Sequence, residues 1–348
     1  MSKTKTLSNA EIASFCRQTA LIIEAGITPA EGMDILIHDT ISAEGKELLE
    51  RISADCRKGY HFGDALINTG VFPEYVIRLI ALGEESGSLD SVLNSLADYY
   101  DREEEIAEGV KSAVTYPLIM IAMMFIIITV LVTKVLPIFK QVFAQLGTEM
   151  TPFAEKLMSA GNSLSKYAIY ITIVLVLVIL ICLALYQIPK TRKSIKRFLN
   201  NFPLTKEFYD NMAAGRFASG MYLAFSSGMD TFHSLDMVSE LVENEKMEKK
   251  IDKVREMIKN RSTMPEAITA AQIFSNLYSR MISVGFISGS VDTVMLQIAD
   301  HYEKATDKQL RRMLSIIEPT LVIILSLIVG VILLSVLLPL MGIMTSIG

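Results

Sequence analysis

Three long uncharged apolar runs interrupt a chain that is otherwise patterned as amphipathic helix. They cover residues 114–133, 167–188 and 319–348. Each run reaches the roughly 20 residues that a helix needs to cross the hydrocarbon core of a bilayer. The pattern therefore predicts an all-α integral membrane protein with three transmembrane helices, at residues 114–136, 167–188 and 319–344.

The first hundred residues carry the start and stop signals of several helices. Ser8 and Glu11 form a capping box, and apolar residues then recur at helical spacing up to Gly26. Thr28 and Pro29 mark a second start, and a third helix carries Leu48, Leu49, Ile52 and Cys56 before Gly59. Because no strand-like alternation occurs, we predict a bundle of helices at residues 1–113.

A short helix is expected to follow Phe72 and Pro73 and to run through Leu82. The chain is then expected to turn at residues 84–88 and to continue as a long helix toward the first apolar run. The motif positions of this hairpin are Phe72, Pro73, Gly83, Gly87 and Ser88, and Gly87 is expected to need a positive φ.

Two carboxylates end the short helix, where the negative end of the helix dipole disfavours them. Glu84, Glu85 and the adjacent Ser86 are therefore candidate contacts for a partner or a cation. The alternative is a solvated turn that tolerates its charges.

The sequence repeats at an offset of 202 residues. The 18 residues from Gly83 and the 18 residues from Gly285 share nine identities, against about one for unrelated segments. Gly285, Ser288 and Gly289 are the second-copy motif positions, whereas Phe286 and Ile287 replace the two acids. The repeated unit is one helical domain followed by one membrane span.

A duplicated single-span unit needs a return helix if both domains are to face one compartment, and residues 167–188 supply it. Basic residues flank the domain at residues 189–318, which places that domain in the cytoplasm. The N-terminus, which resembles no signal peptide, is then inside as well. A short loop at residues 137–166 and the C-terminus are expected outside.

Four prolines mark the predicted boundaries of the membrane helices. Pro117 and its repeat partner Pro319 stand where the long helices are expected to enter the bilayer. Pro137 and Pro339 are expected to end or kink the same helices.

The two copies differ in charge. Residues 1–113 hold 10 Lys or Arg against 20 Asp or Glu, and residues 189–318 hold 19 against 16. This difference indicates separate contact surfaces, although neutral drift on solvated faces is the alternative. An acidic domain is also repelled by the phosphate backbone of nucleic acids, so no nucleic-acid partner is expected.

Signals for chemistry are missing. Three cysteines give no disulfide or metal pattern, and the sequence contains no phosphate-binding loop, no paired metal-binding histidines and no nucleophile elbow. We expect no cofactor and no enzyme activity. A small membrane transporter or channel is the rival class, but the only candidate for a polar or ionisable group within the predicted spans is Lys134, at the outer end of the first span.

The duplicated domain, the phrase FPEYVIRLIALGEESGSL and the span that starts at Tyr116 and Pro117 resemble the inner-membrane platform family of type II secretion and type IV pilus systems. The resemblance covers nearly the whole chain. It implies a non-enzymatic, multi-pass and homo-oligomeric scaffold in the bacterial inner membrane. The implied partners are a cytoplasmic assembly ATPase, pilin or pseudopilin subunits, and bitopic inner-membrane assembly proteins.

Overall fold

A computed structural model describes residues 6–135, 137–138, 141, 145, 205–242 and 244–347. Every regular element in these ranges is a helix, so the predicted helical fold class is confirmed there. The predicted return span at residues 167–188 and nearly all of the predicted loop at residues 137–166 lie outside the described residues.

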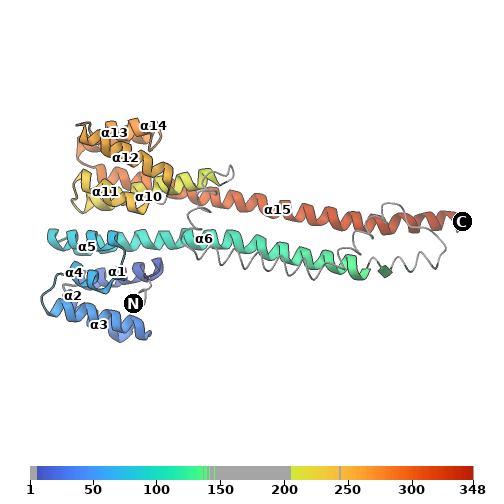
Figure 1. The fold of residues 1–348 in the computed structure, drawn as a ribbon, viewed down its shortest axis with the longest axis horizontal. Coiled ribbons are helices and arrows are strands. Elements are labelled where there is room, and N and C mark those ends of the chain that lie inside the picture. Colours follow the sequence, from blue (N-terminus) through green and yellow to red (C-terminus); the bar gives the residue numbers. More distant parts are fainter. Residues whose placement is uncertain are drawn as a thin grey trace. The chain divides into compact units, whose positions relative to one another are not determined.

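The first repeat forms six helices, and the first four lie on one side of the start of the sixth (Figure 1). Their bounds are α1 (Asn9–Glu24), α2 (Pro29–Asp39), α3 (Ala43–Arg57), α4 (Phe62–Thr69), α5 (Glu74–Ser86) and α6 (Leu89–Val130), and a π-helical turn, η1 (Leu131–Val135), follows α6. Both sides of the Ser8 capping box are formed, and Thr28 accepts a hydrogen bond from the Glu31 backbone N–H at the start of α2. The first three helices were thus predicted, whereas α4 was not.

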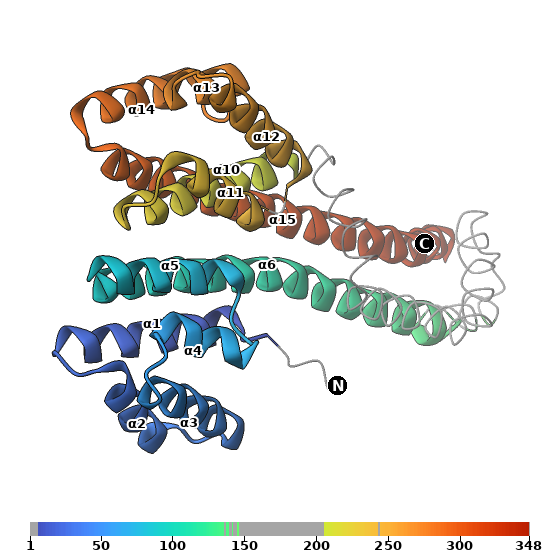
Figure 2. The same cartoon turned by 60° about the vertical axis from the view of Figure 1, so that its left-hand side comes forward.

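The second repeat has the same order of helices, as the view in Figure 2 shows. Its helices are α10 (Lys206–Ser226), α11 (Thr231–Leu241), α12 (Glu245–Lys259), α13 (Met264–Ala271), α14 (Asn276–Ser288) and α15 (Val291–Ile347). The bounds of α11, α12, α13 and α14 are those of α2, α3, α4 and α5 displaced by 202 residues. The repeat found in the sequence is therefore a repeat of the fold.

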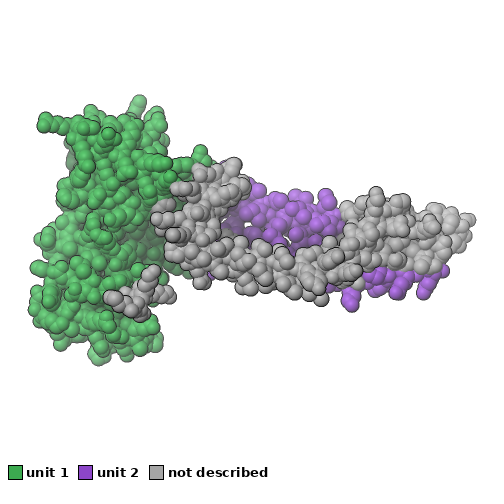
Figure 3. Space-filling model, viewed as in Figure 1, with its two compact units in different colours: residues 1–109, 200–309 green, residues 110–199, 310–348 purple. Residues whose placement is uncertain are grey.

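The chain divides into two compact units, coloured separately in Figure 3. One holds residues 1–109 and 200–309, and the other holds residues 110–199 and 310–348. The first unit contains both helical repeats, each with its own buried apolar cluster. Phe62, Leu66, Leu79 and Leu93 are among the fully buried residues of the first repeat, and Phe217, Ile251 and Ile282 are among those of the second.

Two helices of the described residues, α6 and α15, are long and apolar enough to cross a membrane. Neither begins at its apolar segment, because each starts within its helical repeat. Pro117 lies inside α6, and α15 continues through Pro319 and Pro339 to Ile347. Pro339 therefore does not end its helix. A kink at Pro339 and the boundary roles of the four prolines stay predictions. Pro137 lies two residues after η1 and is itself helical, and a proline there leaves the carbonyl four residues earlier without its usual donor.

Candidate functional site

The hairpin between α5 and α6 differs from its prediction in one respect. Helix α5 continues past Leu82 to Ser86, so Glu84 and Glu85 lie in its last turn and not in a loop. Gly87 then adopts a φ of 73°, and the Ser88 backbone N–H donates to the Gly83 carbonyl at 2.9 Å. Gly289 repeats this geometry with a φ of 73°. Gly87 thus has the positive φ that the sequence predicted, and Gly289 shares it.

The carboxylate of Glu84 caps another helix. It accepts hydrogen bonds from the backbone N–H groups of Phe62, at 2.9 Å, and Gly63, at 3.2 Å. These are the first residues of α4, whose own N-cap residue, His61, makes no side-chain cap. A negative charge is favourable at this positive helix end, which offsets its unfavourable place at the end of α5. Glu84 thus has a structural role that neither reading of the sequence included.

In the second repeat, the equivalent helix α13 is capped by residues at its own N-terminus. Position 286 is phenylalanine, and its ring packs on Phe225 at 5.9 Å between centroids. Thr263 and Glu266 instead form a capping box on α13, in which the Thr263 backbone N–H donates to the Glu266 carboxylate at 2.9 Å. Comparison of the two copies at the 202-residue offset shows that the second copy lacks the acid and gains the capping box. Sequence reasoning missed this signal.

Replacing Glu84 with alanine should lower the free energy of unfolding by about 1–2 kcal/mol, because the N–H groups that open α4 lose their acceptor. Adding His61→Thr and Asp64→Glu to that variant should recover most of the loss, since the pair recreates the box of the second repeat. Thermal unfolding of the full chain in detergent, followed by circular dichroism, measures both effects. If Glu84→Ala melted like the parent, this capping role would be refuted.

The other two candidate contacts at this turn have different surroundings. The Ser86 hydroxyl donates to the Leu82 carbonyl at 2.8 Å and lies 2.7 Å from the Ser88 hydroxyl. Glu85 is exposed, and so is its counterpart Ile287. Glu85 is therefore the acid of the turn whose side chain is open to a partner, and that role stays a prediction.

A second polar site joins the two repeats. Arg216 on α10 donates from Nε to Glu103 on α6 at 2.8 Å, and its Nη2 contacts the other carboxylate oxygen. The side chains of this pair are only 16% and 12% exposed. Arg102 on α6 also pairs with Glu303 on α15 at 2.6 Å. Burial raises the pKa of Glu303 above its usual value, while the Arg102 charge opposes that shift.

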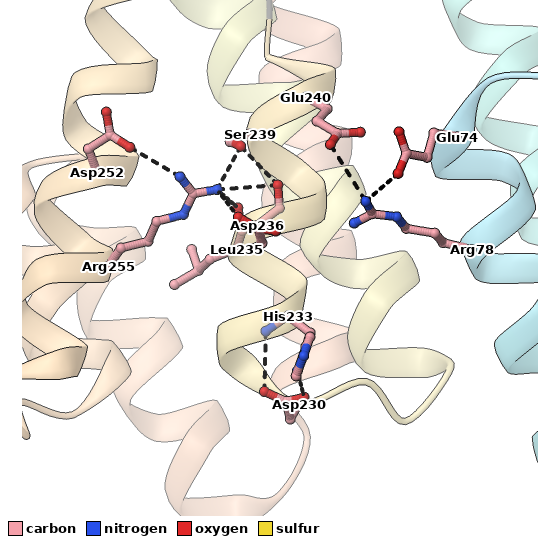
Figure 4. A network of polar contacts seen from close by, with 10 residues as sticks. All are labelled: Glu74, Arg78, Asp230, His233, Leu235, Asp236, Ser239, Glu240, Asp252 and Arg255. Carbon is pink, nitrogen blue, oxygen red and sulfur yellow. Dashed lines mark hydrogen bonds and ion pairs between the residues drawn. The ribbon is translucent and has the colours of Figure 1, made fainter.

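The same junction continues at α5 and α11. Figure 4 shows Arg78 between Glu74 of its own helix and Glu240 of α11, 4.0 Å away. Beside these charges, the apolar residues Leu223, Ala224 and Met237 of the second repeat belong to the buried cluster of the first. The two repeats thus share a continuous interface. Sequence reasoning did not find these ion pairs.

An open groove lies on the first repeat between α1 and α6. Its α6 side carries the acidic residues Asp101, Glu104, Glu105 and Glu108, and its α1 side carries Ala10, Ala13, Ser14, Arg17 and Gln18. Arg17 bonds Asp98 at 2.6 Å and Asp101 at 2.9 Å. The ion pair between Arg17 and Asp101 therefore joins the two sides of the groove, beside three further acids of α6.

Within the described residues, no group of three or more His, Cys, Asp or Glu is placed to hold a metal ion. Burial raises the pKa of Cys16 to about 12 and is the largest cause of a rise to about 11 at Cys56. Such thiols are protonated at neutral pH and are poor nucleophiles.

Comparison with known proteins finds the same repeat. The family model described as type II secretion system (T2SS), protein F, matches residues 15–137 and again residues 217–339, which are displaced by the same 202 residues. A type IV pilus assembly protein PilC of Myxococcus xanthus is 30% identical over 94% of this chain and 79% of its own length. The PilC protein of Thermus thermophilus is 28% identical over 95% and 82%. The type II secretion system protein F of Aeromonas hydrophila is 23% identical over 96% and 86%.

The two matches of the family model together cover more than half of the 348 residues. They fall on equivalent helices of the two structural repeats. The chain belongs to the type II secretion system protein F family, the inner-membrane platform family of type II secretion and type IV pilus systems.

Proposed function

We propose that the chain is the membrane platform on which a type IV pilus or a type II secretion pseudopilus is assembled. One observation carries the proposal: each helical repeat continues, as one helix, into an apolar segment long enough to cross a membrane. A domain joined to its span in this way can pass a movement of its partner into the bilayer. Rigid helices are a known route for such coupling.

In this proposal the chain lies in the bacterial cytoplasmic membrane with its N-terminus inside. The spans are residues 114–136, 167–188 and 319–344, and the middle one returns the chain to the cytoplasm. The basic residues that flank the second domain support this orientation. Both helical repeats belong to one compact unit, which also favours a single compartment for both.

The equivalent exposed positions 47 and 249 allow a direct check of this topology. Glu47→Cys and Lys249→Cys should both be inaccessible to an impermeant maleimide in intact cells and should both react in inverted vesicles. Glu149→Cys, in the predicted outer loop, should show the opposite behaviour. Labelling of positions 47 and 249 from opposite sides would refute the topology.

The proposed partners are a cytoplasmic assembly ATPase, pilin or pseudopilin subunits, and bitopic membrane proteins of the same machine. The sequence has no phosphate-binding loop, so in this mechanism the energy comes from the ATPase. Its movement would act on the helical repeats and pass along α6 and α15. Subunits would then be displaced from the bilayer toward the growing fibre.

Deletion of the gene tests the proposal as a whole. Cells without the chain should still make and process the pilin-like subunits, yet should assemble no fibre, because the platform is needed after processing. Electron microscopy and immunoblots of the processed subunit measure the two steps, and the unmodified gene should restore fibres. Normal fibres in the deletion strain would contradict the proposal.

A further inference from the structure

The two repeats of one chain meet through different faces of the same fold. The first repeat contributes a ridge on α5 and α6 that includes Tyr75, Arg78, Tyr99, Arg102 and Glu103. The second repeat contributes a receiving face on α10, α11 and α15 that includes Arg216, Leu223, Met237, Glu240 and Glu303. A contact between unlike faces of similar units is heterologous and leaves one copy of each face over.

If a pseudo-two-fold axis related the two repeats, both ridges and both receiving faces would be buried in the junction. The described contacts argue against this arrangement. It would pair Lys304 with Asp101, the positions equivalent to Arg102 and Glu303. Lys304 instead bonds Asp300 on its own helix and its side chain is 74% exposed, while Asp101 bonds Arg17. Leu277, the equivalent of Tyr75, is 63% exposed, whereas Tyr75 is 2% exposed. The repeats are therefore arranged head to tail.

The receiving face that stays unused among the described residues lies on α1, α2 and α6 of the first repeat. Leu21 and Ile35 are 59% and 44% exposed there, but their equivalents Leu223 and Met237 are 2% and 0% exposed inside the junction. The acidic groove completes this face. Six positions that line it, namely 10, 13, 14, 17, 101 and 104, are equivalent to positions 212, 215, 216, 219, 303 and 306 around the small cavity of the junction.

The unused ridge lies on α14 and α15 of the second repeat. Leu277 and Val284 form its apolar part, and both are 63% exposed. Its α15 part carries His301, which packs on Tyr278, together with Lys304 and Lys308. These positions are equivalent to Tyr99, Arg102 and Ile106 of the first ridge. The unused ridge is thus apolar at one end and basic at the other.

The two unused faces complement each other. The groove carries Asp101, Glu104, Glu105 and Glu108 opposite the place that the basic residues of a docked ridge would occupy. The apolar residues Leu21 and Ile35 would likewise meet Leu277 and Val284. Complementary charge favours this pairing and disfavours ridge-to-ridge or groove-to-groove contacts, which would oppose like charges.

We infer that a second copy of this chain seats its α14–α15 ridge in the α1–α2–α6 groove, repeating between chains the contact that joins the repeats within one. This inference rests on the proposed function only in placing all copies in one membrane with the same orientation. The internal pairs fix the register. Lys304 of one copy pairs with Asp101 of the next, and Ala305 lies opposite Ser14, as Glu103 lies opposite Arg216.

Crosslinking between two differently tagged full-length chains tests the contact. One chain carries Ser14→Cys and the other Ala305→Cys, so a product with both tags arises only between copies. In the equivalent internal pair, the long side chains of Glu103 and Arg216 span the gap between the two backbones. Two cysteines at such positions are too far apart to form a disulfide. A short bis-maleimide is therefore used as the crosslinker on membrane vesicles. We expect a strong product with both tags, and only background when either cysteine is absent.

Charge exchange identifies the contact as the proposed one. Lys304→Glu with Lys308→Glu should reduce the crosslink about tenfold, because like charges then face each other. Glu104→Lys with Glu105→Lys in the other chain should restore it. Lys249→Glu, which also breaks an exposed helical ion pair, serves as the matched control and should leave the yield unchanged.

An internal control separates this inference from the fold and from the proposed function. Arg78→Cys with Glu240→Cys should crosslink within one chain, because those side chains meet at 4.0 Å. If that internal product forms while the product between copies is missing, or is insensitive to charge exchange, the inference is overturned. Fibre assembly and membrane topology are read in separate assays, so they can succeed or fail independently.

Discussion

Replacing Gly83 with valine will destabilise the first repeat by about 3 kcal/mol, which would lower the melting temperature of the full chain by about 6–12 °C. Gly83 lies where α5 crosses the start of α6. A Cβ atom there would come within 2.9 Å of the Val92 side chain and 3.2 Å of the Leu89 Cα. The second contact is with backbone, which cannot yield without moving α6. Circular dichroism of the chain in detergent measures the shift.

The second repeat offers a replicate of this experiment and α10 offers a control. A Cβ atom at Gly285 would come within 2.9 Å of the Val294 side chain and 3.2 Å of the Val291 Cα, so Gly285→Val should lower the free energy of unfolding by a similar amount. At Gly215 an added Cβ atom would lie 3.6 Å from the Tyr302 Cβ, which is ordinary van der Waals contact. Gly215→Ala should therefore leave the melting temperature nearly unchanged. Equal melting of the Gly83 and Gly215 variants would show that the close crossing is unimportant.

The first three helices could be predicted because their signals are local. Ser8 and Glu11 start α1 and Thr28 starts α2 within a few residues of the apolar positions that follow. Helix α4 was missed because it is eight residues long and its N-cap residue makes no side-chain cap. Its cap comes from Glu84, 22 residues away from Phe62, and such a partner is visible only once α4 and α5 are packed.

The candidate site shows the same limit. The sequence indicated that helix energetics alone did not explain Glu84, and the structure supplies the missing partner in α4. The sequence also showed that the copies differ in charge, but it could not show where that difference is used. Glu103 and Arg216 are 113 residues apart and have Ala305 and Ser14 as their repeat equivalents. Comparison at the 202-residue offset could have marked both positions.

The charge difference between the repeats is therefore used partly inside the chain. An acid of the first repeat, Glu103, neutralises a base of the second, Arg216. Within the first repeat, Arg17 forms an ion pair with Asp101. In the second repeat, serine occupies the position equivalent to Arg17, and Glu303, the equivalent of Asp101, forms an ion pair with Arg102 of the first repeat. A substitution at one repeat position thus converts a bond within a domain into a bond between domains.

Arg216→Ala should destabilise the joined repeats by about 3 kcal/mol, because the carboxylate of Glu103 then stays buried without its partner. The expected value lies at the low end for broken buried pairs, since a small cavity beside the pair, with Ser219 and Thr306 in its lining, can admit water to the unpaired charge. The exposed pair Arg51 and Glu47 is the matched control. Its side chains are 61% and 65% exposed, so Arg51→Ala should cost only about 0.5 kcal/mol.

A double-mutant cycle decides whether the two charges act as one unit. Glu103→Ala should cost about as much as Arg216→Ala, and the double variant should cost much less than the sum, because removing both leaves no unpaired charge. Chemical unfolding of the four proteins in detergent gives the coupling free energy. Additive losses would mean that each residue packs independently and that the pair does not join the repeats. Strong coupling would show that the two charges act as one unit in joining the repeats.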